Sequence, residues 1–429
     1  MKRRRFIIDG GKVFLSALYI PNFISENPQD LGIEIEQITF GSEHHFFGYI
    51  GQSLTIPWNK NGNHIVCLSS SFHDHLPGKG EAANVNLINL DRKIKGHYLV
   101  EKLDESQGWN PQQGTMFYWN PHRPDHQFFF NDRDPKSGVI FTVLYDINKR
   151  QRVKTFHYGH QSFGNSGVCP LGKYFLAINY ARMARLRPVT GYKGSYDWTD
   201  SVSAPKDDGI AIVNIETGEK EILISFEQMA NGLEQNGFDV KDRNLFINHT
   251  LWSRDGQWIY FFVRAGWKSD KDGREGLNAA CSIKVDGTQF IAGHQHIGGH
   301  PEWFQGTQII GSNKNQQVIY DILQKKIIGT IGSSDIFPKP GGDISVSPDG
   351  KWLVNGYNNK SGANFYSIMN LKTGAWVKTP SFETGDYKKD LRIDPAPRWN
   401  HNNNQILVSG LDKNKIRQLF VISIHHKFV

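Results

Sequence analysis

A polar side chain able to do chemistry recurs at the same place in each of several repeated segments of this sequence. The place lies about six to eight residues ahead of a polar turn. In chain order the residues are Gln113, Asn165, His249, His300, Asp343 and Asp394, and the first repeat, with a longer lead-in, offers His44 and His45. Imidazoles, carboxylates and amides can act as metal ligands, proton carriers or amide donors, whereas chance would favour glycine, serine and apolar residues.

The repeated segment is a short strand, a polar turn and a second strand. Its clearest copy is 344–355, ISVSPDGKWLVN, and 250–261 repeats it closely. Looser copies, or copies with altered turns, lie at 54–66, 116–128, 167–176, 301–310 and 397–408. Four short strands per unit and about 40 to 60 residues per unit are typical of a propeller blade. We therefore predict an all-β fold, a single seven-bladed β-propeller, with one short helix at 226–233.

The rim of such a propeller is where these polar residues would meet. The innermost strand of each blade runs along the central axis, so the residue just before it reaches the rim. A mixed imidazole and carboxylate set suits a divalent ion such as manganese, zinc or iron. The alternative is that these side chains cap strands and bind water. His73 and His75 form a further pair that could bind metal but is more typical of a polar loop.

Three arginines open a long insertion in the third repeat. Arg182, Arg185 and Arg187 lie within 180–192. Guanidinium groups bind carboxylates bidentately, so an acidic sugar is one interpretation of the cluster. A solvated basic loop, or pairing with the acidic residues at 207–208, is the other.

Composition limits the classes of function. The chain of 429 residues has a net charge of +7, which permits an acidic partner. Its basic residues are scattered and no recognition motif accompanies them, so we expect no nucleic-acid partner. Cys67, Cys169 and Cys281 are widely spaced in apolar runs and are predicted to be core residues. No nucleophile elbow, phosphate loop, zinc-protease motif or dinucleotide fingerprint is present, which argues against covalent hydrolase and nucleotide chemistry.

The amino terminus is predicted to be an export leader. Residues 1–32 are assigned to it and to an extension, and 33–429 to the propeller. Arg3, Arg4 and Arg5 precede a moderately apolar stretch at 13–23, which resembles a twin-arginine export signal and predicts a periplasmic or secreted protein. Asp9 and Lys12 interrupt the region, so an ordinary basic start of a cytoplasmic protein stays open. No stretch approaches the roughly 20 apolar residues of a membrane span.

The last four repeats resemble the oligogalacturonate lyase family of seven-bladed propellers. The matching segments are Asn248-His249-Thr250, Gly299-His300-Pro301-Glu302-Trp303, Gly342-Asp343-Ile344-Ser345 and 394–399. The first half resembles a broader set of uncharacterised bacterial propellers related to those lyases, through 44–49, 109–114, 131–133 and 181–192. The resemblance spans about residues 40–425.

This resemblance implies a metal-assisted β-elimination on acidic oligosaccharides that contain uronic acids. A base removes the proton beside the carboxylate, a manganese ion neutralises that carboxylate, and an unsaturated sugar is left. The resemblance makes His300, Asp343 and Asp394 the metal site and places His249 beside the reacting carbon. Arg182 and Arg187 are the other catalytic candidates, and the remaining rim residues are assigned to substrate: His44, His45, Gln113 and Asn165.

The sequence also departs from the family pattern. Asp343 stands where the family has histidine, Asp394 or Ala396 occupies the last histidine position, and Pro340 replaces a glutamine. A carboxylate can replace imidazole for an oxygen-preferring ion, so the site can persist. The alternatives are a non-catalytic propeller that has a degenerate metal site and binds a glycan or a protein at the same rim, and a hydrolase with an acid and base pair.

Overall fold

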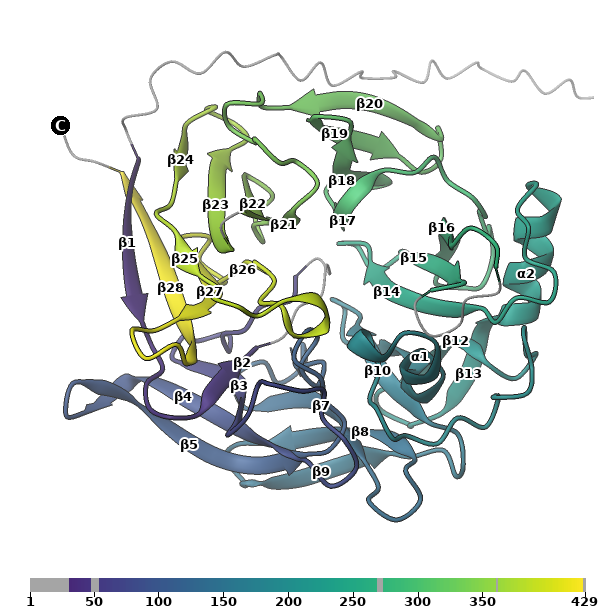
Figure 1. Ribbon diagram of the computed structural model, residues 1–429, viewed down its shortest axis with the longest axis horizontal. Helices are drawn as coiled ribbons and strands as arrows, with labels where there is room; N and C mark the ends of the chain where they lie inside the picture. Colours follow the sequence, from purple (N-terminus) through teal and green to yellow (C-terminus); the bar gives the residue numbers. More distant parts are fainter. Residues whose placement is uncertain (1–30, 48–53, 268–272, 360–361, 427–429) are drawn as a thin grey trace, which may run out of the picture.

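The fold is a β-propeller, in which sheets follow one another around a ring in chain order (Figure 1). The computed structural model describes residues 31–47, 54–267, 273–359 and 362–426. Most of the predicted leader therefore lies outside the described residues. The prediction of an all-β propeller is confirmed, and the described strands form six hydrogen-bonded sheets.

Four of the sheets are antiparallel meanders of strands consecutive in sequence. The first contains β2 (His44–Phe46), β3 (His64–Ser70), β4 (Ala83–Ile94) and β5 (His97–Ser106). The second contains β6 (Tyr118–Trp119), β7 (Gln127–Arg133), β8 (Ile140–Asp146) and β9 (Gln151–Phe156). The third contains β10 (Phe163–Val168), β11 (Tyr174–Asn179), β12 (Gly209–Asn214) and β13 (Lys220–Ser225). The fourth contains β14 (Phe246–Trp252), β15 (Trp258–Ala265) and β16 (Leu277–Lys284).

The fifth sheet has nine strands and consists of two antiparallel groups. One group is β17 (Gly298–Trp303), β18 (Gln308–Asn313), β19 (Gln316–Asp321) and β20 (Lys326–Ile331). The other is β21 (Asp343–Val346), β22 (Trp352–Asn358), β23 (Ala363–Asn370), β24 (Trp376–Lys378) and β25 (Phe382–Glu383). A single parallel pair, His300 with Asp343, joins the two groups.

The sixth sheet closes the ring with strands from both ends of the chain. It contains β26 (Arg398–Trp399), β27 (Gln405–Leu411), β28 (Arg417–His426) and β1 (Leu31–Gln37). β1 pairs antiparallel with β28 through seven residue pairs, from Leu31 with His426 to Gln37 with Phe420. The first described strand therefore completes a sheet that the last part of the chain begins (Figure 1).

Buried tryptophans at the inner strands explain why this residue recurs in the repeat. In four of them the indole N–H donates to a backbone carbonyl of a neighbouring blade. The pairs are Trp119 to Pro57 at 2.8 Å, Trp252 to Gly167 at 2.8 Å, Trp303 to Leu251 at 2.8 Å and Trp399 to Ser345 at 3.0 Å. These bonds link adjacent blades at the inner strands that carry the candidate site.

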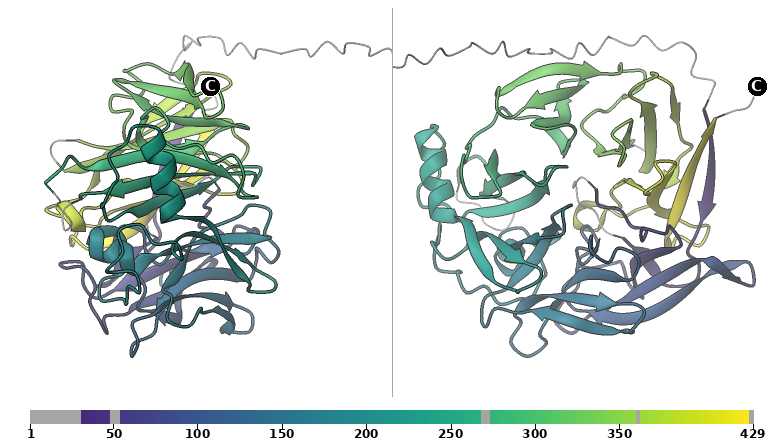
Figure 2. Two further views of the ribbon diagram at one scale, coloured as in Figure 1. Left: turned by 90° about the vertical axis from the view of Figure 1, so that its right-hand side faces the viewer. Right: turned by 180° about the vertical axis from the view of Figure 1, so that it is seen from behind.

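Helices are few, and the longest lies outside the ring. α2 (Phe226–Gln235) confirms the predicted short helix, and Ser225 and Gln228 form its capping box. Figure 2 shows α2 against the outer wall. α1 (Tyr180–Leu186), η2 (Pro188–Thr190) and η3 (Lys389–Leu391) complete the described helices. No helix in the described ranges is long and apolar enough to span a membrane. The three cysteines are free and buried, as predicted.

Candidate functional site

Three of the predicted rim residues come together at the inner edges of β14, β17 and β21. The imidazole rings of His249 and His300 lie 5.3 Å apart between centroids, at an interplanar angle of 71°. Nδ1 of His300 contacts Oδ1 of Asp343, and the contact is an ion pair when the imidazole is protonated. The other carboxylate oxygen of Asp343 accepts the N–H of Ala396 at 3.0 Å. The side chain of Asp343 is 5% exposed and that of His300 31%, so the imidazole is the accessible member.

Unusual backbone geometry places these side chains. His249 has φ 61° and lies where the register between β14 and β15 shifts. A positive φ is uncommon for residues other than glycine and is found at functional sites. Gly299 has φ 75°, and a Cβ there would lie 3.1 Å from the backbone of Gly341. A glycine at this position therefore lets β17 approach β21 closely enough to bring His300 and Asp343 into register.

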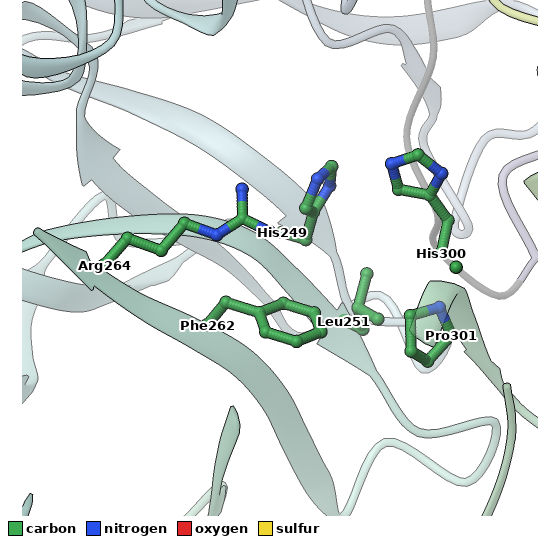
Figure 3. A pocket seen from close by; sticks show the side chains of 7 residues that line it. His249, Leu251, Phe262, Arg264, His300 and Pro301 are labelled. Carbon is green, nitrogen blue, oxygen red and sulfur yellow. The ribbon is translucent and has the colours of Figure 1, made fainter. Parts of the chain in front are cut away.

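A small pocket collects this chemistry in one place. Its lining residues are His249, Leu251, Phe262, Arg264, Gly299, His300 and Pro301. Its volume is about 10 Å³, which is room for about one water molecule. Figure 3 shows both imidazoles and the guanidinium of Arg264 on one side, above Leu251, Phe262 and Pro301. An apolar floor beside nitrogen-bearing groups suits an anionic group such as a carboxylate.

The electrostatics give the two imidazoles different properties. Burial lowers the pKa of His249 well below its usual value, and the nearby charges of His300 and Arg264 lower it further. His249 is therefore neutral at physiological pH. Burial alone would raise the pKa of Asp343, but the charge of His300 and its hydrogen bond outweigh burial, so the pKa is lowered. Asp343 is thus an ionised partner for His300.

The predicted manganese ligands are not assembled as a metal site. Asp394 is bound by Arg392, with Nε to Oδ1 at 2.7 Å and Nη2 to Oδ2 at 3.0 Å. Burial, and then the charge of Asp343, raise the pKa of Asp394. Across the described ranges, no three His, Cys, Asp or Glu side chains are grouped to hold a metal ion. The residues present therefore do not fit a manganese ion in this arrangement.

Arg182 is buried in the insertion and supports it. Its guanidinium donates to the backbone carbonyls of Leu245 at 2.6 Å, Thr199 at 3.0 Å and Val202 at 3.0 Å. It also lies 4.9 Å from the ring centroid of Phe226. These contacts hold α1 and the insertion against the ring, and Arg182 does not line the small pocket.

Arg264, which no sequence motif marks, lies close to the predicted Arg187, and the charges of both contribute to the lowered pKa of His249 after burial. Arg187 lies 5.0 Å from the ring centroid of Trp267, and Arg264 lies 4.9 Å from the same ring. Arg264 lines the pocket. The sequence offers one indication of where Arg264 lies. It is two residues after Phe262 on the same strand, and residues two apart on a strand share one face.

The four predicted substrate residues lie in different surroundings. Gln113 donates to Oδ1 of Asn248 at 3.3 Å and so reaches the residue beside His249. The Nδ1 of His44 accepts the backbone N–H of Arg417 at 3.1 Å. His45 is buried, and burial lowers its pKa. Asn165 is fully buried and its amide donates to the Met116 carbonyl at 2.8 Å. The structure therefore brings Gln113 near the pocket and gives Asn165 a position inside the fold.

A buried carboxyl on β17 provides a test of the site's surroundings. Burial raises the pKa of Glu302 from 4.5 to about 7, with the charges of Arg398 and Arg254 opposing this in part. The folded state therefore holds this proton to a higher pH than the unfolded chain. Its contribution to stability is present below about pH 4.5 and is lost as pH rises toward about 7.

We predict that Glu302→Gln removes this loss. Relative to wild type, the variant should gain about 2.5 kcal/mol in unfolding free energy between pH 5 and pH 8, because one pKa unit corresponds to about 1.4 kcal/mol. Urea unfolding at the two pH values measures the gain. Glu234→Gln, on the exposed side of α2, is the matched control. Parallel pH profiles for Glu302→Gln and wild type would contradict the prediction.

Comparisons with known proteins give the fold. No protein-family model matches the chain, and no curated protein matches it. A solved oligogalacturonate lyase in complex with manganese is similar, with a TM-score of 0.58 and 13% identity, over 92% of this chain and 97% of that one. A prolyl endopeptidase structure has a TM-score of 0.49 and 10% identity, over 90% of this chain and 51% of that one. TolB from Acinetobacter baumannii has a TM-score of 0.40 and 12% identity, over 92% and 96%.

Proposed function

We propose that this chain is a lyase of the oligogalacturonate-lyase type that cleaves acidic, uronic-acid-containing oligosaccharides by β-elimination. The observation that carries the proposal is the His300–Asp343 pair beside neutral His249 and the cation of Arg264. An imidazole oriented by a carboxylate is a general base whose protonated form the carboxylate stabilises. A guanidinium beside it can bind the carboxylate of a uronic acid.

The proposed reaction uses each of these groups once. Arg264 binds the substrate carboxylate and stabilises the negative charge that develops on it. His300 removes the proton from the carbon next to that carboxylate. The electron pair forms a carbon–carbon double bond, the bond to the leaving sugar oxygen breaks, and that oxygen takes a proton from solvent. Asp343 stabilises the resulting imidazolium, and uncharged His249 adds no positive charge beside it.

The test is turnover of polyuronides followed by the ultraviolet absorbance of the unsaturated product. We expect absorbance to rise with wild type and not with His300→Asn. His160→Asn, an exposed histidine between β9 and β10, is the matched control and should behave as wild type. A flat trace for wild type across a panel of polyuronides, with and without added divalent ions, would overturn the lyase proposal.

We predict that chelation changes this turnover little. The carboxylates of Asp343 and Asp394 are already engaged by His300 and Arg392, so the proposed elimination does not depend on Mn²⁺. Dialysis against EDTA should leave the rate within about twofold of the untreated protein, which corresponds to a change of about 0.4 kcal/mol or less in the activation free energy. Elemental analysis of undialysed protein checks the same point. Stoichiometric manganese that disappears in His300→Ala would contradict the prediction and restore the metal-assisted reaction.

A non-catalytic glycan-binding propeller is the second candidate. The engagement of Asp394 by Arg392, which removes a ligand that the resemblance requires, favours it. Binding of a polyuronide without an unsaturated product would support this function. A hydrolase would instead release new reducing ends without the ultraviolet absorbance.

We also propose that the ring has seven blades, formed by 33–429 together with the start of β1. The support is that the two groups of the nine-stranded sheet share only the pair of His300 and Asp343, so each group can be counted as one blade. Export by the twin-arginine-like leader, to the periplasm or outside the cell, is a separate proposal. Amino-terminal sequencing of protein recovered from each cell fraction tests it.

A further inference from the structure

A second and much larger cavity lies between three segments that are distant in sequence. Its volume is about 600 Å³. The segments are the loop after β3, the stretch that follows β25 and contains η3, and the turn between β27 and β28. The lining residues are His73, Asp74, Glu383, Gly385, Asp386, Tyr387, Lys388, Leu391, Leu411, Asp412 and Lys415. It shares no lining residue with the small pocket at His249.

His73 in the wall of this cavity is the feature that calls for a ligand. Its side chain is buried, with the residue 2% exposed. The backbone of Leu391 lies close enough to act on the electrostatics of the ring, but neither ring nitrogen has a hydrogen-bond partner of good geometry among the described residues. Leaving a buried polar group unpaired costs about 1 to 3 kcal/mol, so such groups in native proteins usually mark a missing partner. The ring is held by Tyr387, which stacks on it with centroids 4.2 Å apart at 18°.

The chemical state of His73 limits what that partner can be. Burial lowers the pKa of His73 to about 2, and the charges of Arg417 and His44 contribute to the shift. A neutral imidazole offers one N–H donor and one acceptor nitrogen. The two nitrogens point in different directions, so each needs its own partner. A sugar carries several hydroxyl groups, of which one can accept from the N–H and another can donate to the acceptor nitrogen. A carboxylate only accepts and an ammonium group only donates, so each leaves one nitrogen unsatisfied.

The rest of the lining indicates an uncharged ligand with an apolar face. Four carboxylates line the cavity against two lysines: Asp74, Glu383, Asp386 and Asp412 against Lys388 and Lys415. This balance disfavours a uronic acid, in contrast to the small pocket with its arginine. Tyr387, Leu391 and Leu411 supply apolar surface. Cavities of about 300 to 1,000 Å³ hold small organic ligands, so one or two sugar rings can enter.

We propose that this cavity is a binding site for a neutral sugar, which places separate hydroxyl groups on the two ring nitrogens of His73 and its apolar face on Tyr387 and Leu411. The site is separate from the proposed elimination and does not depend on it. An enzyme or a binding propeller of this fold would then recognise an uncharged sugar at one place and an acidic group at another.

Ligand-observed saturation-transfer NMR on the full chain tests the proposal. The uncharged probes are methyl α-L-rhamnoside, methyl β-D-galactoside and methyl β-D-glucoside, and the charged probes are galacturonate and glucosamine. We expect at least one neutral glycoside to bind, and His73→Phe to weaken that binding at least tenfold because it keeps the ring stack and removes both nitrogens. Tyr196→Ala, an exposed tyrosine outside the cavity lining, should bind as wild type does.

A second variant keeps the test decisive if His73→Phe does not fold. Leu411→Trp narrows the cavity from a half-buried position and should also abolish neutral-sugar binding. Polyuronide turnover or binding, measured on the same samples, should remain at the wild-type level, which separates this site from the pocket at His249. Binding of no neutral glycoside, or stronger His73-dependent binding of galacturonate or glucosamine, would overturn the proposal.

Discussion

Replacing Asp343 by asparagine is expected to lower polyuronide turnover by roughly 10²- to 10⁴-fold while leaving substrate affinity nearly unchanged. The amide has almost the same size and can still accept the N–H of Ala396. It carries no charge, so it cannot stabilise the imidazolium that forms on His300. Its NH₂ group can also donate to Nδ1, which selects the wrong tautomer for proton removal at Nε2.

The measurement is kcat and KM on a polyuronide that wild type cleaves, with circular dichroism to confirm folding. Asp349→Asn is the matched control, because Asp349 lies in the turn after β21 and its carboxylate accepts the Ser347 hydroxyl at 2.6 Å. Its turnover should stay within about twofold of wild type. A folded Asp343→Asn variant with an unchanged kcat would show that His300 is not the base.

Removing β1 is expected to have the largest effect on stability. A chain that starts after Gln37 loses all seven residue pairs with β28. At about 0.5 to 1.5 kcal/mol per hydrogen bond the loss is about 5 kcal/mol, comparable to the total stability of many domains. It also exposes β28 as an unpaired edge with buried residues such as Val421 and Ile422. We expect an aggregating or unfolded product.

A chain that starts at Leu31 is the matched control, because it keeps every residue of β1. Size-exclusion chromatography and thermal unfolding compare the two. If the chain lacking β1 kept the wild-type elution volume and melted at the wild-type temperature, the pairing of β1 with β28 would not be what closes the ring.

The propeller could be predicted because its signal is local and repeated. The segment 344–355 folds as the end of β21, a turn and the start of β22, as its pattern indicates. Alignment of the repeats also located His249, His300 and Asp343, because the inner strand of each blade begins at the same end of the ring. Position within the repeat was therefore sufficient to find three residues that meet in space.

The partners of these residues could not be predicted in the same way. Arg182 donates to carbonyls as far along the chain as Leu245, and no sequence pattern indicates that contact. The position of Asn165 in the repeat matches that of His249, yet its amide caps the backbone. Asp394 is different, because its partner Arg392 is only two residues away. That spacing was a visible sign that the carboxylate would be neutralised by a cation.

The closing pair of strands also determines when the protein can finish folding. Among the described strands, β1 is the first to leave the ribosome and its partner β28 is the last. The blades between them can form from local contacts while synthesis continues. Ring closure must wait for the whole chain and brings together its most distant residues, which is an intrinsically slow step. Until then both edges of the unfinished ring are open to pairing with other chains.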